Sequence, residues 1–301
     1  MEQIIKIKDP IFKKDTSCFI CDSKESKVLY KYLYAKNSSD ILQCISCGHL
    51  FIHPVPLASL NERTMDTIAD AEFFGHPTLK FLHEKLIINR EIKIIDKILK
   101  SKNKTLLDLG CGTGWSTAIW QKNGFKVTGL EPSLTRSKIA REAHGLNVSN
   151  EHLENFKTAE LFDVIVLRHL LEHIENPTEM LKKIKTFLKP DGLLLIIIPN
   201  IDCLGRYIYQ EHWEWILPWH LHFYTPKTLT RLLAKLGYFK IKIYQTPSPL
   251  WHPQTLNRAL TNSLKIRLPF FLALPLSLPV VLLGFLLNKN DNMTLIFRNS
   301  K

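Results

Sequence analysis

A run of apolar residues that ends in three closely spaced glycines constrains this chain more than any other feature. Residues 105–115 read TLLDLGCGTGW, in which Asp108 is followed by Gly110, Gly112 and Gly114. An apolar run of this kind is typical of a strand in a buried parallel sheet, and the glycines allow the backbone to turn sharply and to approach a ligand closely. The segment therefore predicts an α/β fold with a ligand-binding loop at the end of one strand.

A second acidic residue follows the next predicted strand. The run FKVTGLE ends at Glu131, and an acid at this place in a nucleotide-binding α/β fold accepts hydrogen bonds from ribose hydroxyls. A dinucleotide site has the spacing G-x-G-x-x-G, whereas Trp115 stands where that motif has its last glycine. The two strands together favour a nucleotide-like ligand over a simple tight turn.

The spacing G-x-G-x-G, with an acid two residues before it, resembles the first motif of class I S-adenosylmethionine-dependent methyltransferases. Residues 162–200 resemble the fourth strand, crossover helix and fifth strand of that family, including a Glu-His pair at Glu172 and His173. Residues 219–245 resemble its histidine-aromatic segment, helix and sixth strand. Smaller bacterial methyltransferases with an N-terminal cysteine module are the most similar members.

The resemblance implies an α/β fold with a Rossmann-like seven-stranded sheet and a small N-terminal zinc-binding module. The uncharged run at residues 268–287 adds a hydrophobic insertion before the last predicted strand. The resemblance also implies S-adenosylmethionine as the cofactor. We expect the cofactor to be bound by the two acids, the glycine loop, the proline after the second acid and the arginine that ends the fourth strand. These residues are Asp108, Gly110, Cys111, Gly112, Gly114, Glu131, Pro132 and Arg168.

Two C-x-x-C pairs lie near the N-terminus, Cys18 with Cys21 and Cys44 with Cys47. Such pairs bring four thiolates within reach of a tetrahedral zinc ion. Because four sulfur ligands leave no position for a substrate, we expect the zinc to hold the fold and not to act in catalysis. A redox role or a lost metal site is the alternative.

The motifs predict three regions. A zinc-binding module spans residues 1–56, a linker with covering helices spans 57–104, and the methyltransferase core spans 105–301, including the hydrophobic insertion at 246–290. We expect these boundaries because the cysteine pairs, the amphipathic segment and the glycine loop follow one another along the chain.

Residues 77–100 have apolar side chains at helical spacing, with lysine and glutamate on the other side. This pattern predicts an amphipathic helix that covers the sheet. The apolar positions are Leu79, Leu82, Leu86, Ile92, Ile95 and Leu99. Upstream, Phe73 and Phe74 are expected to pack in the core, with a position over the cofactor as the alternative.

The composition is that of a packed enzyme. The 301 residues are 45% hydrophobic and 23% charged, and the formal net charge of +12 permits a nucleic acid, an anionic membrane or a phosphorylated substrate as partner. The lysines are scattered, which indicates a solvated basic surface. The opening MEQIIKIKDPIFKKD contains no apolar stretch of a signal peptide, so we expect a cytoplasmic location.

Residues 268–287, LPFFLALPLSLPVVLLGFLL, carry no charge over the length of a membrane span. However, the segment lies between two predicted strands of one sheet, and its three prolines disfavour a straight spanning helix. The flanking basic residues, suited to an anionic leaflet, are Lys265, Arg267 and Lys289. We therefore favour a monotopic or re-entrant contact with the cytoplasmic face of a membrane; a lid, a dimer surface and a true span are the alternatives.

Methyl transfer from a sulfonium requires positioning and, for a hydroxyl or acidic carbon acceptor, a base. The stretch PWHLHFYTP would place His220, His222 and Tyr224 on one side of an extended segment at the carboxyl edge of the sheet. These three residues and His173 are the candidate catalytic residues. Helix capping or packing against nearby tryptophans is the alternative role.

These patterns predict a methyltransferase that acts on an oxygen or carbon of a small or lipid-linked acceptor, such as a sugar, a polyprenyl glycan or a quinone-like ring. One alternative is a nucleic-acid-binding protein that uses the zinc module. It is disfavoured because few basic and aromatic residues, such as Phe19, Lys24 and Lys27, surround the cysteines. The other alternative is a membrane-associated scaffold with an inactive methyltransferase fold.

Overall fold

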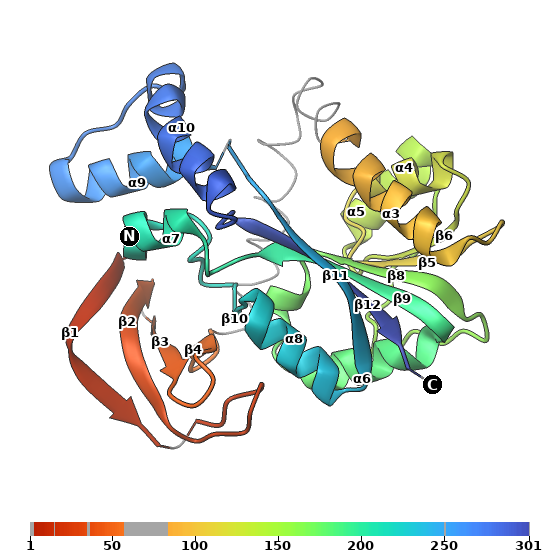
Figure 1. Ribbon diagram of the computed structural model, residues 1–301, viewed down its shortest axis with the longest axis horizontal. Helices are drawn as coiled ribbons and strands as arrows, with labels where there is room; N and C mark the ends of the chain where they lie inside the picture. Colours follow the sequence, from red (N-terminus) through yellow and green to blue (C-terminus); the bar gives the residue numbers. More distant parts are fainter. Residues whose placement is uncertain (1–2, 15, 35–36, 57–83, 250, 301) are drawn as a thin grey trace. The chain divides into compact units, whose positions relative to one another are not determined.

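The computed structural model describes residues 3–14, 16–34, 37–56, 84–249 and 251–300 (Figure 1). The described chain divides into two compact units that are discontinuous in sequence. The first unit contains the described residues of 1–56, 171–179 and 197–296, and the second contains those of 57–170, 180–196 and 297–301. The N-terminal residues thus share a unit with later parts of the chain, and the predicted boundaries at residues 56 and 104 stay a prediction.

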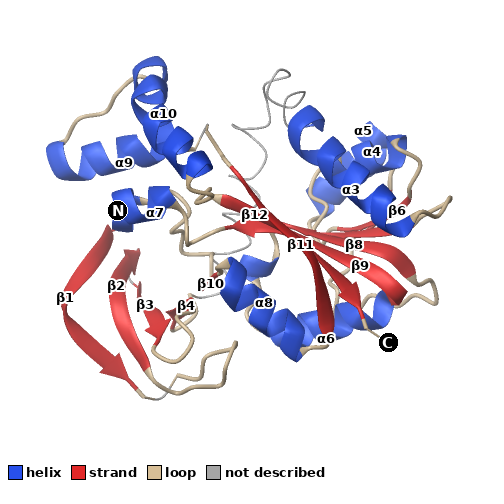
Figure 2. Ribbon diagram, viewed as in Figure 1, coloured by secondary structure: helices blue, strands red, loops and turns tan. Residues whose placement is uncertain are grey.

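The larger sheet has seven strands in the order β11-β12-β9-β8-β5-β6-β7. Figure 2 draws the strands in red and the helices in blue. The strands of the larger sheet are β5 (Thr105–Leu109), β6 (Lys126–Leu130), β7 (Asn147–Ser149), β8 (Phe162–Arg168), β9 (Leu188–Pro199), β11 (Tyr238–Thr246) and β12 (Asn292–Asn299). Strand β5 pairs in parallel with β6 and β8, and β6 pairs in parallel with β7. The predicted fold class is confirmed.

The helices around these strands follow from local sequence signals. They are α3 (Asn89–Leu99), α4 (Trp115–Lys122), α5 (Leu134–His144) and α6 (Pro177–Phe187), and a π-helical turn, η1 (Glu84–Ile88), precedes α3. In α5, Ser133 caps the first turn by accepting a hydrogen bond from the Arg136 backbone N–H, and Gly145 ends the helix in the left-handed region.

The predicted helix at 77–100 is confirmed in part. Its described portion is helical, and Ile92 and Ile95 are buried, but the side chain of Leu86 is 64% exposed. Leu86 was expected on the buried face; it lies in the π-helical turn, which changes the angle between successive side chains. Leu79, Leu82, Phe73 and Phe74 lie outside the described residues.

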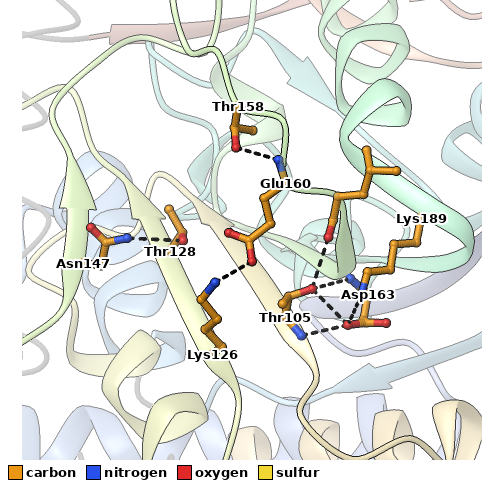
Figure 3. Close-up of polar contacts among 9 residues, drawn as sticks. Thr105, Lys126, Thr128, Asn147, Thr158, Glu160, Asp163 and Lys189 are labelled. Atoms are coloured by element: carbon orange, nitrogen blue, oxygen red, sulfur yellow. Dashed lines mark hydrogen bonds and ion pairs between the residues drawn. The ribbon is translucent and has the colours of Figure 1, made fainter.

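The polar side chains at the amino-terminal end of β5 and β8 form a closed network (Figure 3). The Asp163 carboxylate accepts hydrogen bonds from the Thr105 N–H at 2.8 Å, the Thr105 hydroxyl at 2.9 Å and the Lys189 ammonium at 2.8 Å. Beside it, Lys126 pairs with Glu160 at 2.8 Å. At this end of the parallel strands, the polar side chains therefore have hydrogen-bond and ion-pair partners within the protein.

The first unit is built on a five-stranded sheet in the order β1-β2-β3-β4-β10. Its strands are β1 (Gln3–Lys13), β2 (Ser26–Tyr34), β3 (Asn37–Cys44), β4 (Leu50–His53) and β10 (His222–Phe223). Strand β10 pairs antiparallel with β4, and the Ile52 N–H donates to the Leu221 carbonyl at 2.9 Å. A core that includes Tyr32, Ile41 and Trp213 packs on this sheet.

The first unit also contains helices and helical turns. They are η2 (Leu171–His173), α7 (Leu204–Tyr209), η3 (Gln210–His212), α8 (Pro226–Lys235), α9 (His252–Leu264) and α10 (Phe270–Leu286). Thr225 and Thr228 form a capping box that begins α8. The helix lies within residues 219–245, where the resemblance predicts one.

Helix α10 carries most of the hydrophobic insertion and remains continuous through Pro275 and Pro279. It contacts α9 and α7 through a narrow stripe of mostly small buried residues, Ala273, Ser277, Val281 and Gly284. Its large side chains point outward: Phe271 is 72% exposed and Leu286 is 77% exposed. None of the helices in the described part of the chain combines the length and hydropathy that crossing a bilayer requires.

Candidate functional site

The glycine loop lies between β5 and α4 in the second unit, and each of its glycines has a positive φ. The N–H groups of Gly110 and Cys111 donate to the Leu130 carbonyl at 2.7 and 3.3 Å, which holds the loop beside the end of β6. A Cβ on Gly114 would lie 2.5 Å from Leu146 Cδ1, so a side chain at this position would collide with the core. Gly112 has no atom within 4 Å of its would-be Cβ and needs glycine for its φ alone.

Asp108, the last polar residue of β5, is almost fully buried beneath the loop. One carboxylate oxygen accepts a hydrogen bond from the Thr117 hydroxyl at 2.6 Å, and the other, Oδ1, has no hydrogen-bond partner among the described residues. Burial raises the pKa of Asp108 to about 6. A buried carboxylate oxygen without a partner fits a cationic or hydrogen-donating ligand, as the ammonium or N–H groups of S-adenosylmethionine would provide.

Glu131 follows β6 directly and is also buried. Its Oε2 accepts a hydrogen bond from the Gly112 N–H at 3.0 Å, and its Oε1 accepts from the Ser133 N–H at 3.0 Å and from Arg136 Nη2 at 2.9 Å. The structure thus brings the acid and the glycine loop together. Among the described residues, Oε2 accepts the hydrogen bond from Gly112, and because a carboxylate oxygen can accept two, it could also accept one from a ribose hydroxyl.

Three other predicted cofactor residues have different surroundings. Arg168 forms an ion pair with the fully buried Glu91 of α3, so its charge is compensated within the protein. Cys111 is buried, and its Sγ would lie 2.8 Å from a Cβ on Gly129, so the thiol fills space beside β6. Pro132 lies between Glu131 and the N-cap of α5. Their roles in cofactor binding stay a prediction.

The four N-terminal cysteines converge in the first unit. Sγ of Cys18 lies 3.6 Å from that of Cys47, and Sγ of Cys21 lies 3.5 Å from that of Cys44. Four sulfurs bound to one zinc at about 2.3 Å in a tetrahedron stand roughly 3.75 Å apart. The cluster therefore has the ligand set and spacing of a closed zinc site.

The loops of the two cysteine pairs share one backbone geometry. The residue after each second cysteine, Asp22 or Gly48, has a positive φ, and its N–H donates to the carbonyl of the first cysteine of the pair, at 2.8 Å from Asp22 and at 2.9 Å from Gly48. Burial raises the pKa of the Cys47 thiol to about 11 and that of Cys18 further. A cation such as a bound zinc would therefore stabilise the thiolate forms of Cys18 and Cys47.

The candidate catalytic residues of the first unit separate into two groups. The first contains His173 and His220, whose ring centroids are 4.8 Å apart. Nδ1 of His173 lies 2.9 Å from the Trp219 carbonyl, and Nδ1 of His220 lies 2.9 Å from the Trp215 carbonyl. Because a carbonyl only accepts, each Nδ1 carries the proton and each Nε2 carries the lone pair of the neutral ring.

The second group contains His222 and Tyr224, which pack against His49 in the core. The His49 and His222 rings stack at a centroid distance of 5.4 Å, and Tyr224 lies 5.2 Å from His49. Burial lowers the pKa of His222 to about 4 and holds that of His49 well below its usual value. Both histidines are neutral at pH 7, and His222 is a weak base.

Several residues at these sites were missed by sequence reasoning. Thr117, Arg136 and Glu91 hold the candidate cofactor residues, and His49 completes the buried aromatic stack. Arg136 and Thr117 lie in the first turns of the helices that follow Glu131 and the glycine loop, and their position in sequence could have indicated them. No local signal marks Glu91 or His49, because their partners are distant in sequence.

Comparison with known proteins identifies the family. The family described as a methyltransferase domain matches residues 81–242, which is more than half of the chain. The chain belongs to this family and has the fold of class I S-adenosylmethionine-dependent methyltransferases.

Two similar curated proteins are ubiquinone biosynthesis O-methyltransferases. The one from Coxiella burnetii is 31% identical over 154 residues, which cover 47% of this chain and 66% of that protein. The one from Actinobacillus pleuropneumoniae is 34% identical over 108 residues, which cover 32% of this chain and 46% of that protein. The chain thus spans less than two thirds of the length of these relatives.

Solved structures share the fold at low sequence identity. A plantazolicin methyltransferase in complex with SAH has 17% identity and a TM-score of 0.50, over 76% of this chain and 93% of that one. A protein from Galdieria sulphuraria, assigned as a sarcosine dimethylglycine methyltransferase, has 19% identity and a TM-score of 0.51, over 73% of this chain and 86% of that one.

Proposed function

We propose that this protein transfers the methyl group of S-adenosylmethionine to an oxygen or carbon of a small or lipid-linked acceptor. The observation that carries the proposal is the glycine loop at the end of β5, where the Gly112 N–H donates to the Glu131 carboxylate at 3.0 Å and where Asp108 Oδ1 has no hydrogen-bond partner among the described residues. A sugar, a polyprenyl glycan and a quinone-like ring are the acceptor classes. The O-methyltransferase relatives favour an oxygen acceptor.

The chemistry is an in-line displacement. The acceptor oxygen forms a bond to the methyl carbon as the bond from that carbon to the sulfonium sulfur breaks, and the hydroxyl proton passes to a base. We assign this role to His220 or His173, because each has an Nε2 lone pair oriented by a bond from Nδ1 to a carbonyl. His222, with a pKa of about 4, is a weaker candidate, and Tyr224 is expected to support the packing.

Calorimetry with S-adenosylmethionine and its demethylated product tests the cofactor. Wild-type protein should bind both, and a protein that binds neither at millimolar concentration would contradict the proposal. Untargeted mass spectrometry of lipid and glycan extracts, from cells with and without the gene, then identifies the acceptor as a species lighter by one methylene.

Turnover measured on that acceptor distinguishes the roles of His173, His220 and His222. His220→Ala or His173→Ala should lower turnover by about 100-fold, the ordinary size of a lost general base, with unchanged cofactor affinity. His222→Ala should act mainly through stability, because it opens a cavity beside His49. A larger loss of turnover in a folded His222→Ala protein would reverse the assignment.

We further propose that the four-cysteine cluster holds a structural zinc ion, as in methyltransferases that carry an N-terminal zinc module. Cys18, Cys21, Cys44 and Cys47 would be the ligands. Elemental analysis should find zinc in the purified protein, and Cys44→Ser should lower the zinc content and the stability. A metal-free and fully folded wild type would contradict this assignment.

The exposed face of α10 supports a membrane surface as the source of the acceptor. Large apolar side chains, among them Phe271, Leu282 and Leu286, point away from the unit, and the exposed Lys265 and Arg267 precede the helix. Apolar residues beside basic residues match an anionic leaflet, into which each buried leucine or phenylalanine contributes roughly 1.5 to 3 kcal/mol. The site of action would then be the cytoplasmic face of a membrane.

Flotation on vesicles tests the membrane contact. Phe271→Ser with Leu286→Ser should prevent flotation on anionic vesicles while cofactor affinity is retained, whereas Leu134→Ser, which changes a leucine 69% exposed in the other unit, should have no effect. Replacing residues 268–287 with a polar linker should also release the protein. If the wild type does not float, α10 instead covers a partner or a second copy.

A further inference from the structure

We propose that Glu172, His173 and His220 form a second metal site, which binds a divalent first-row transition-metal cation such as Zn²⁺. Each of the three side chains offers one ligand atom, and these atoms lie within 4.8 Å of one another in the first unit. Two imidazoles and one carboxylate are a ligand set that such cations prefer. The site is distinct from the four-cysteine cluster, which has only sulfur ligands.

The ring orientations support this assignment. The Trp219 and Trp215 carbonyls fix the proton on Nδ1 of His173 and His220, at 2.9 Å in each case. A metal-binding histidine in proteins is ordinarily held in this way, with its second nitrogen bonded to a carbonyl or carboxylate, which makes the other nitrogen the ligand. Both rings of the proposed site have this arrangement, and neither bond depends on a metal.

The backbone positions the ligands before any cation binds. Glu172 and His173 lie in the short η2 turn, and the Leu221 N–H donates to the Glu172 carbonyl at 2.7 Å, which ties this turn to the segment that carries His220. Glu172 and His220 are both buried, and they line a common cavity of about 10 Å³ together with Trp213 and Phe223. This space suits one water-sized species, such as a metal ion or a water molecule.

Three protein ligands leave at least one coordination position for an oxygen donor, as in catalytic zinc sites. This last step rests on the proposed methyl transfer: with the cation bound, the imidazoles serve as ligands, and coordination of the acceptor hydroxyl would lower its pKa in place of a histidine base. Cation binding itself does not depend on that step, and it can be measured without cofactor or acceptor.

Cobalt titration of the full-length protein, purified with zinc in its four-cysteine cluster, tests the site. We expect one added Co²⁺ per chain, with d–d absorption bands but without the thiolate-to-cobalt charge-transfer band that a sulfur site would produce. Glu172→Gln and His220→Ala should each weaken this binding by about tenfold or more. His152→Ala, which removes an exposed imidazole of the other unit, is the matched control and should leave it unchanged.

A variant that does not fold would not decide the question, and substitutions of the buried Glu172 and His220 carry that risk. His173→Ala is therefore the second test, because His173 is only partly buried. Circular dichroism establishes that each titrated variant is folded. Absence of a second cobalt equivalent in the wild type, or its retention in folded His173→Ala and His220→Ala, would overturn the proposal. Because no S-adenosylmethionine is present, failure here is distinct from failure of the methyl-transfer proposal.

Discussion

The two ends of the parallel strands β5 and β8 are equally part of the core of the second unit, yet their polar groups are arranged in opposite ways. At the amino end, the Asp163 carboxylate receives three hydrogen bonds from Thr105 and Lys189 (Figure 3). At the carboxyl end, Asp108 keeps an oxygen without a described partner, and the chain continues into glycines with positive φ. An end whose polar groups have hydrogen-bond partners stabilises the sheet. An end with glycines and a carboxylate oxygen that lacks a described partner is suited to a ligand.

The largest effect on stability should come from a substitution at Gly114, the glycine of the loop that packs against the core. Gly114→Ala would place a Cβ 2.5 Å from Leu146 Cδ1 and 2.8 Å from Ala140 Cβ at a φ of +78°, so we expect a loss of about 3 kcal/mol or more of unfolding free energy. Gly112→Ala, with open space around its Cβ, should cost only about 1 kcal/mol. Urea unfolding measures both, and equal losses would show that packing does not distinguish the two glycines.

Asp108 and Asp163 should make the free energy of unfolding depend on pH in opposite directions. Burial raises the folded-state pKa of Asp108 to about 6, so the cofactor-free protein should lose up to about 3 kcal/mol of stability as the pH rises from about 4 to 6, and Asp108→Asn should remove this loss. Burial alone would raise the pKa of Asp163, but hydrogen bonds from Lys189 and Thr105 outweigh burial and hold this pKa below its usual value.

The Asp163 contribution is therefore present above about pH 4 and is lost as the pH falls through the folded-state pKa. Asp163→Asn should remove that acid-side loss and leave the slope between pH 4 and 6. Urea unfolding at a series of pH values checks both variants. Slopes of the same sign at the two ends would contradict the comparison.

The third effect is on cofactor binding. Glu131→Ala removes the proposed ribose acceptor and the partner of the Gly112 N–H, and Gly112→Val forces a branched side chain into a left-handed conformation. Each should weaken S-adenosylmethionine binding by about tenfold or more, as measured by calorimetry. Asp163→Asn, at the opposite end of the strands, is the control and should bind the cofactor with wild-type affinity.

The smallest effect should come from the exposed ion pair at the amino end. Glu160→Gln breaks the 2.8 Å contact with Lys126, whose side chain is largely exposed, so stability should change by no more than about 0.5 kcal/mol and cofactor affinity should not change. Thermal unfolding at low and high salt measures this. A loss above 1 kcal/mol would mean that the amino-end network acts as a unit.

Local patterns in the sequence predicted several elements of the fold. The buried run before Gly110, the capped helix after Thr225 and the paired cysteines each specify backbone conformation within a few residues. The exposure of Leu86 and the pairing of Arg168 with Glu91 were not predictable in this way. The exposure of Leu86 depends on the π-helical turn, and the pairing of Arg168 depends on a helix 77 residues away in sequence; apolar periodicity determines neither.

The sequence by itself determined the strand, the glycine loop and the cysteine spacing, because these depend on backbone dihedrals and on ligands close together in the chain. Only the tertiary structure decided that His220 lies with Glu172 and His173 while His222 stacks on His49. Alternation along an extended segment predicts that His220, His222 and Tyr224 point to one side, but it does not predict which residues they contact. Those neighbours come from the residue before β4 and from η2, distant in sequence, and packing of the first unit selects them.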